Sequence, residues 1–265
     1  MKVVVCTKQT PSTTAVFTVN NGTVSWDDPG GKPNVVNPWD EYAIEEGIRL
    51  KENHGASDVI ALAVGSEESK EALKTALAMG CTEAILVSDD AFAGSDAVGS
   101  ARVWAAAINH VSDAKVALFG KLTIDDNMGV AAMMTAQKLG WTPLTFVSAI
   151  KEISEDSITV ERLLDDGKET VTAPLPAVLS LVKEINEPRY PSFMGIRKAN
   201  RAEIPVWSAG DLTVEGETGA AASKVDWSHV YTIPPREGSV TLIEADSVEE
   251  QAKLLADKLF EEKVI

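Results

Sequence analysis

The chain has few residues of the kinds that carry covalent or metal chemistry. Its 265 residues include 2 cysteines, Cys6 and Cys81, and 3 histidines, His54, His110 and His229. Their spacing provides no disulfide framework, no paired thiol motif and no metal-ligand cluster. Scattered histidines near helix ends act as caps more often than as catalysts. The sequence therefore predicts neither a metal site nor a catalytic triad, and its cysteine usage fits a reducing cytoplasm.

Positive charge and long apolar runs are also scarce. The formal net charge of −16 and the pI near 4.6 argue against a nucleic-acid binder, which needs a basic face to neutralise phosphates. The short apolar run within "MKVVVCTK" is much shorter than a membrane span or the core of a signal peptide. We therefore expect a cytoplasmic protein with no membrane insertion.

Short β-branched runs alternate with longer segments of helical periodicity over the first half of the chain. Buried parallel strands are predicted at residues 2–7, 58–64, 83–88 and 115–120. The helices that follow them are predicted to begin at Asp40, Ser66, Ser95 and Asn127, with Ser66 and Ser95 as N-caps and Gly55, Gly80 and Gly140 as stops. This order is typical of a doubly wound, mainly parallel α/β sheet.

The second half of the chain has a different pattern, with successive strand-like runs and few helical segments. Strand-like runs follow one another from about Leu144, and the "DDG" turn at residues 165–167 predicts a hairpin, so we expect an antiparallel extension of the sheet. Residues 209–222 lack periodicity and are interpreted as a linker or extended loop. An amphipathic helix, with Ser247 as a possible cap, closes the chain. The predicted division is an α/β domain at residues 1–208 and a linker with a C-terminal arm at residues 209–265.

Two loops at the predicted carboxyl ends of the strands are candidates for ligand binding, because open α/β sheets bind ligands there. One covers residues 34–41. The other covers residues 120–131, where glycines, hydroxyls and a helix N-terminus could present backbone N–H groups to a phosphate. It has neither a Walker motif nor GxGxxG. The alternative is that Asp125, Asp126 and Asn127 only cap a helix. Cys6 could be a nucleophile, although a small buried residue near a ligand is the simpler interpretation.

Four motifs resemble those of the electron transfer flavoprotein beta subunit in the same order. They are "NPWDEYAIEEGIRLKE", "TALAMGCTEAILV", "GKLTIDD" and "NEPRYPSFMGIRKA", and together they span most of the chain. The resemblance implies a Rossmann-like fold of the adenine nucleotide alpha hydrolase type. It also implies an electron carrier subunit, not an enzyme, in a heterodimer whose alpha subunit holds most of the redox-active FAD. A structural AMP is implied in the beta subunit.

The resemblance places cofactor contacts at strand ends and in the two loops. The implied residues are Cys6, Asn37, Pro38, Trp39, Asp40, Val64, Gly120, Lys121, Leu122, Thr123, Ile124, Asp125, Asp126, Asn127, Met128, Gly129, Val130 and Ala131. Thr13 stands where some family members place a tyrosine against the flavin ring.

The resemblance also assigns the basic, aromatic segment at residues 185–204 to a recognition loop. It implies docking of flavin-dependent dehydrogenases, such as acyl-CoA dehydrogenases, and transfer to a quinone oxidoreductase or similar acceptor. The implied partner contacts are Glu187, Pro188, Arg189, Tyr190, Pro191, Ser192, Phe193, Met194, Gly195, Ile196, Arg197 and Lys198. Arg189, Arg197, Lys198 and Arg201 would face acidic partner surfaces, and Phe193 would be the apolar anchor. The alternative is that Tyr190 and Phe193 pack internally.

Three other functions stay open at this point. Family members that bifurcate electrons hold a second FAD in place of AMP, but "DDNMGVAA" lacks the Gln-Val-Gly ending that we associate with them, so AMP is favoured. A stand-alone AMP- or ATP-binding regulator of the stress-protein type would need its own homodimer surface. An adenylate-handling enzyme would need a catalytic base or an activating lysine, and Lys121 is the single candidate found.

Overall fold

The computed structural model describes residues 1–235 and 237–265. The chain forms two compact units, Met1–Val230 and Tyr231–Ile265. Residues 209–222, interpreted above as a linker, lie within the first unit. Backbone and side-chain hydrogen bonds tie them to the rest of that unit, among them Gly219 N–H to Ser95 Oγ at 2.7 Å and Ala220 N–H to the Ala93 carbonyl at 2.9 Å.

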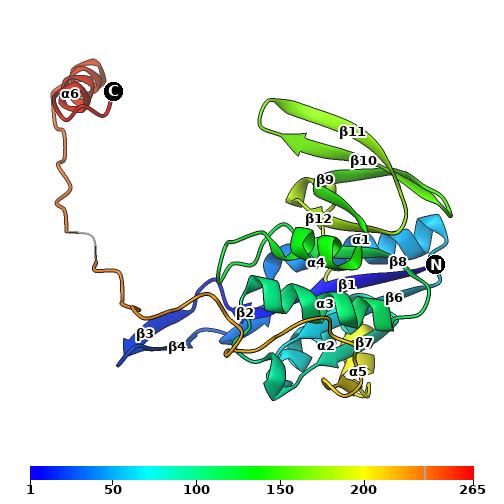
Figure 1. The fold of residues 1–265 in the computed structure, drawn as a ribbon. Helices are drawn as coiled ribbons and strands as arrows, with labels where there is room; N and C mark the ends of the chain where they lie inside the picture. Colours follow the sequence, from blue (N-terminus) through cyan, green and yellow to red (C-terminus); the bar gives the residue numbers. More distant parts are fainter. Residues whose placement is uncertain (236) are drawn as a thin grey trace. The chain divides into compact units, whose positions relative to one another are not determined.

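The first unit is built on a sheet whose strand order is β11-β10-β9-β12-β8-β1-β6-β7-β13 (Figure 1). Its strands are β1 (Lys2–Thr7), β6 (Asp58–Val64), β7 (Glu83–Val87), β8 (Ala114–Gly120), β9 (Thr142–Ile153), β10 (Ser157–Leu164), β11 (Gly167–Pro174), β12 (Ala177–Leu181) and β13 (Val206–Trp207). The seven strands β9, β12, β8, β1, β6, β7 and β13 run parallel to their neighbours in that order. Strand β10 pairs antiparallel with β9 on one side and with β11 on the other. The predicted doubly wound sheet with an antiparallel extension is confirmed.

Four helices connect the parallel strands, namely α1 (Pro38–His54), α2 (Lys70–Met79), α3 (Ala97–His110) and α4 (Ala131–Leu139). Gly55, Gly80 and Gly140 end α1, α2 and α4 as predicted. The two predicted serine N-caps are wrong. A 3₁₀ turn at Glu67–Ser69 separates Ser66 from α2, and the side chain of Asp96, not of Ser95, accepts hydrogen bonds from the first turn of α3.

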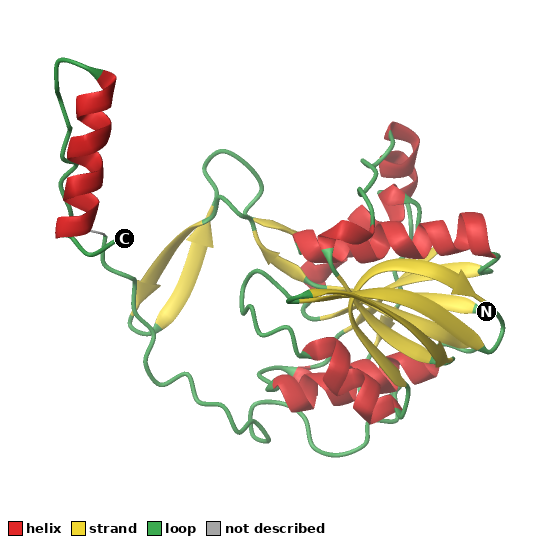
Figure 2. Cartoon of the chain, turned by 90° about the horizontal axis from the view of Figure 1, so that it is seen from above, coloured by secondary structure: helices red, strands yellow, loops and turns green. Residues whose placement is uncertain are grey.

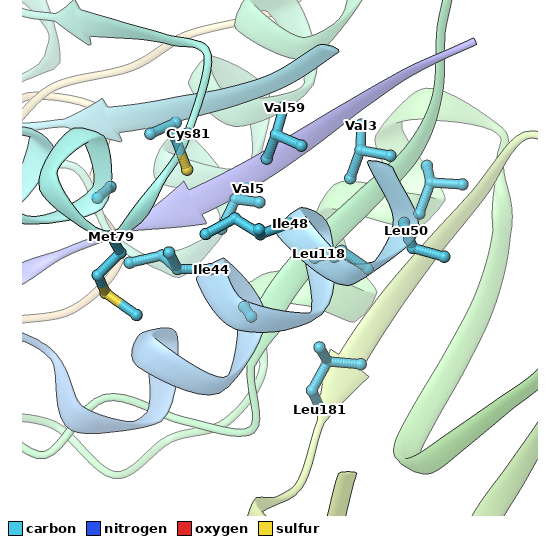
Figure 3. Close-up of a cluster of buried hydrophobic side chains, with 14 of the residues drawn as sticks. Val3, Val5, Ile44, Ile48, Leu50, Val59, Met79, Cys81, Leu118 and Leu181 are labelled. Atoms are coloured by element: carbon cyan, nitrogen blue, oxygen red, sulfur yellow. The ribbon is translucent and has the colours of Figure 1, made fainter. Parts of the chain in front are cut away.

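Helices cover both faces of the sheet (Figure 2). On one face Ile44 and Ile48 of α1 pack with Val5 of β1 and Leu118 of β8 (Figure 3). On the other face residues of α3 and α4, such as Trp104 and Ala136, form a second buried cluster with Cys6 and Phe119. Each fully buried aliphatic side chain contributes about 1.5–3 kcal/mol. These two layers fix the positions of the strand ends and therefore of the loops that follow them.

Several elements carry no pattern that the sequence analysis recognised. They are β2 (Gln9–Pro11), β5 (Asn34–Val36), the hairpin of β3 (Val16–Asn20) and β4 (Thr23–Asp27), short 3₁₀ turns at Asp90–Phe92 and Lys183–Ile185, and α5 (Phe193–Ala199). Nearly every residue of the β3–β4 hairpin is exposed, so the alternation of Val24 and Trp26 with polar residues in β4 does not mark a face buried in the core. In the second unit, α6 (Val248–Glu261) begins where predicted, because Ser247 Oγ accepts the Glu250 N–H.

Candidate functional site

The loops after β1 and β8 meet where the strand order reverses. Chain order runs from β1 to β6 and β7 on one side, and then returns to β8 on the other side of β1. In open α/β sheets such a switch point leaves a crevice at the carboxyl ends of the two strands, because the connections leave in opposite directions. Val64 and Gly120 end their strands and Cys6 is the next-to-last residue of β1, so the three lie at the carboxyl ends of neighbouring strands.

Asn37 and Asp40 hold the start of α1 against both loops. Asn37 donates from Nδ2 to the Leu122 carbonyl at 2.9 Å, and its Oδ1 accepts from the Ile124 N–H at 3.3 Å. Asp40 accepts the N–H of Lys8 at 2.8 Å and that of Gly120 at 3.3 Å. Burial raises the pKa of Asp40 to about 7, although these hydrogen bonds act in the opposite direction. The polar atoms of Asn37 and Asp40 are thus used in hydrogen bonds that hold the loops in place.

The segment between β8 and α4 is a compact series of turns. The Asn127 N–H donates to the Thr123 carbonyl at 2.9 Å, and the Met128 N–H donates to Asp126 Oδ1 at 2.9 Å. Asn127 and Gly129 both have positive φ, of 55° and 65°. The helix begins only at Ala131, with Val130 in the cap position. The alternative that Asp125, Asp126 and Asn127 cap this helix is therefore wrong, because they lie before the turn that leads into it.

Lys8 offsets one of the two negative charges of the acidic pair, Asp125 and Asp126. Its Nζ lies 2.7 Å from Asp125 Oδ2 and 3.5 Å from Asp126 Oδ2. Two carboxylates would otherwise repel a phosphate, and an ammonium group between them reduces that repulsion. The sequence analysis missed Lys8, although it comes directly after β1, where ligand-contacting residues are expected.

Lys121 lies between two aromatic rings at the rim of the site. Its Nζ is 5.6 Å from the centroid of the Trp39 ring and 5.3 Å from that of Phe146 on β9. A cation held over two ring faces is stabilised by both π-systems, which restricts the position of the ammonium group. The sequence analysis did not predict Phe146 as a site residue. It lies on β9, which follows α4 in the chain, and only the folded sheet brings it next to Lys121.

The donor set of the site fits a phosphate. No side chain caps the N-terminus of α4, so the first-turn N–H groups and the positive end of the helix dipole are available to an anion. Thr123 Oγ1 is buried beside the Asp125 carboxylate and makes no further hydrogen bond within residues 1–235 and 237–265. Cys6 does not fit a nucleophile. It is 2% exposed, and burial followed by the charge of Asp40 raises the pKa of its thiol well above the ordinary value.

Comparison with known proteins assigns the chain to a family. Residues 28–212 match the electron transfer flavoprotein domain. The chain is 34% identical to the caffeyl-CoA reductase-Etf complex subunit CarD of Acetobacterium woodii, over 100% of both chains. It is 30% identical to the electron transfer flavoprotein subunit beta of Megasphaera elsdenii and 31% identical to that of Bacillus subtilis, again over 100% of both chains. The chain belongs to the electron transfer flavoprotein family. Its role is that of a beta subunit, as the sequence motifs predicted.

The segment of this beta subunit that resembles a recognition loop is anchored to α1. Asn186 Nδ2 donates to the Tyr42 carbonyl and to Glu46 Oε2, both at 3.0 Å. The guanidinium of Arg189 binds Glu45 Oε2 at 2.7 Å and Glu52 Oε1 at 2.8 Å. Arg189 is thus engaged by carboxylates of its own chain, and its contact with an acidic partner stays a prediction. Arg189 neutralises Glu45, which is 3% exposed.

The rest of the segment faces outward. Ser192 Oγ accepts the Gly195 N–H and starts α5, which packs against α2. Tyr190 is 95% exposed, Phe193 81% and Met194 68%. The alternative that Tyr190 and Phe193 pack internally is therefore wrong. Arg197, Lys198 and Arg201 are exposed beside them, so the surface combines apolar side chains with positive charge.

The described residues, 1–235 and 237–265, contain neither a candidate membrane-spanning helix nor a candidate metal site. Within these ranges no helix combines the length and the apolar content needed to cross a membrane. The same residues contain no group of three or more histidines, cysteines or carboxylates placed to hold a metal ion.

Proposed function

We propose that this beta subunit binds a structural AMP at the carboxyl ends of β1 and β8 and docks flavin-dependent dehydrogenases through its recognition segment, 185–204. In this proposal the chain pairs with an alpha subunit that holds most of the FAD. It acts as an electron carrier subunit and performs no turnover by itself. The observation that supports the nucleotide proposal is the segment 120–131, whose turns and uncapped helix start could present backbone N–H groups to a phosphate at the switch point of the sheet.

The phosphate is assigned to the start of α4. The N–H groups of its first turn have no side-chain cap, and the Thr123 hydroxyl lies buried beside Asp125 in the loop before it. Ion pairing with Lys8 lets Asp125 and Asp126 stay close to the nucleotide. We assign these carboxylates to the ribose hydroxyls, since carboxylates accept hydrogen bonds from hydroxyl groups. AMP has no redox group, so its contribution is to stabilise the folded state by mass action.

The identity of the bound nucleotide is tested by extracting it from the purified heterodimer and separating it by chromatography. We expect AMP and FAD in equal amounts. Two FAD per heterodimer and no AMP would replace this proposal with the bifurcating alternative. The stand-alone regulator is not retained, because the family assignment decides against it.

We propose that the C-terminal unit, Tyr231–Ile265, packs against the alpha subunit. Helix α6 has no buried residue, and Leu254, Leu255 and Phe260 are between 44% and 69% exposed. An amphipathic helix buries its apolar face against a partner, which here is the alpha chain. Deleting the chain from Ser247 should therefore lower the yield of alpha that co-purifies. Full yield with the truncated chain would exclude this role for α6.

Phe193→Ala is expected to weaken docking without unfolding the protein. Burying the exposed ring in a partner pocket is worth roughly 2 kcal/mol, which corresponds to a loss of about 30-fold in affinity. The measurement is electron transfer from a partner dehydrogenase at limiting concentration, together with the melting temperature. Leu164→Ala, at an exposed position on the β10–β11 hairpin, is the control and should change neither quantity. Unchanged transfer in Phe193→Ala would contradict the proposed anchor.

A further inference from the structure

A second hollow lies on the α3–α4 face of the sheet, away from the start of α4. Its volume is about 370 Å³. It is lined by one face of α3, by Lys138 in the last turn of α4 and by the segment 213–215. The AMP assigned above lies at the opposite end of α4, so the two sites are separate.

The rim of this hollow is dominated by positive groups. Arg102 and Lys138 form no ion pair among the described residues, although the chain has 40 acidic and 24 basic residues. His110 and the amide of Asn109 also line the hollow, Glu215 is the carboxylate among its described lining residues, and Asp211 lies close enough to interact with His110. The buried Ala105 and Ala106 of α3 leave room for a ligand between these groups.

Arg102 is held in place by the backbone of residues 216–217. It donates from Nη1 to the Glu217 carbonyl at 2.5 Å. Gly216 lies flat against the guanidinium, because a Cβ there would come within 2.9 Å of Arg102 Cζ, and its φ of 91° also favours glycine. The segment is itself fixed, since Leu212 is buried and the Gly219 and Ala220 N–H groups are hydrogen-bonded. A guanidinium fixed in this way loses little side-chain entropy when it binds an anion.

His110 is also positioned by its neighbours. Its ring packs edge-on against the ring of Trp207 at a centroid distance of 4.6 Å, and Trp207 belongs to the edge strand β13. The hollow thus has a guanidinium and an imidazole that neighbouring residues hold in place, the ammonium group of Lys138, and the methyl groups of Ala105 and Ala106. Two permanent cations match a doubly charged ligand better than a singly charged one.

From this geometry we propose that the hollow between α3, the end of α4 and the segment 213–217 binds the phosphate group of a small phosphate monoester. Arg102 binds two phosphate oxygens through its planar donor fork, Lys138 supplies the second charge, and His110 contacts the third oxygen. Glu215 opposes binding through repulsion and limits the affinity. The carbon portion of the ligand lies on Ala105 and Ala106.

The test is titration of the intact heterodimer with inorganic phosphate, observed by NMR at the imidazole of His110. The signal is assigned with His110→Gln, and sodium chloride at matched ionic strength is the control. We expect a saturable shift of the His110 signal and none of the His54 signal. Acetate at the same concentration should be the weaker ligand by about tenfold, since it carries one charge.

Three variants separate binding from folding of the segment. Arg102→Gln and Lys138→Gln should each weaken phosphate binding by about tenfold, and Lys138→Gln leaves every contact of the segment 213–217 intact. Glu215→Gln should strengthen binding, which local unfolding cannot imitate. Nucleotide extracted from all three should match wild type, so this proposal can fail independently of the AMP proposal. An equal shift with chloride, equal affinity in Lys138→Gln, or tighter binding of acetate would each overturn it.

Discussion

Gly120→Val is expected to lower the melting temperature by roughly 5–10 °C and to abolish the nucleotide binding proposed above. A Cβ at this position would lie 2.6 Å from Trp39 C and 2.6 Å from Asp40 Oδ1. Both belong to the first turn of α1, so the added side chain must push the helix start away from β8. That displacement breaks the hydrogen bond from the Gly120 N–H to Asp40 and disturbs the contacts between Asn37 and the loop.

This result would have a different cause from the one that the sequence indicated. Gly120 was predicted to touch the nucleotide, whereas the structure shows it touching α1. The matched control is Gly167→Val, because nothing lies within 4 Å of a Cβ there. The measurements are thermal unfolding of the heterodimer and the nucleotide released on denaturation. Retention of AMP by a Gly120→Val variant with a wild-type melting temperature would show that the start of α1 tolerates displacement.

Arg189→Met is expected to lower the free energy of unfolding by about 2–3 kcal/mol. The substitution leaves Glu45, which is 3% exposed, with Arg49 as its remaining ion-pair partner at 2.8 Å. The loss is therefore at the lower end of what breaking a buried ion pair costs. The segment that carries Phe193 is attached to α1 through the same guanidinium, so partner docking should weaken too. Chemical denaturation and the dehydrogenase transfer assay measure the two effects.

A double variant separates the ion pair from the packing. Glu45→Gln combined with Arg189→Met removes the buried charge and should recover part of the lost stability. Lys168→Met, which breaks an exposed pair with Glu161, is the control and should cost under about 1 kcal/mol. A single Arg189→Met variant as stable as this control would show that Glu45 is not dependent on Arg189.

The same ion pairs predict a dependence on pH. Burial alone would raise the pKa of Glu45, but hydrogen bonds from Arg189 and Arg49 hold it below the ordinary value of 4.5. For Glu52, the hydrogen bond from Arg189 lowers the pKa. A carboxyl whose pKa is lower in the folded state stabilises the fold above its unfolded pKa and loses that contribution as pH falls. Arg189→Met should therefore show a smaller loss of stability than wild type between about pH 5 and pH 3.

The sequence predicted the sheet and its strand bounds well, because buried parallel strands carry continuous apolar runs. Those of β1 and β6 match to the residue. It did not predict β13, whose two residues form a strand only because β7 offers an unpaired edge. It also missed α5, a helix of 7 residues that depends on packing against α2, since so short a segment has little intrinsic helicity.

By itself, the sequence determined the family, the fold class and the strand ends where the candidate site lies, since local periodicity and motif order carry that information. Only the tertiary structure decided what each polar group contacts. Lys8 and Asp125 are 117 residues apart in the chain yet form an ion pair at 2.7 Å, and Arg189 and Glu45 are 144 apart yet also pair at 2.7 Å. Such pairings follow from the order of strands in the sheet and from which helix covers which face. No local pattern encodes them, because a charged side chain has the same sequence signature whether it faces solvent or a buried partner.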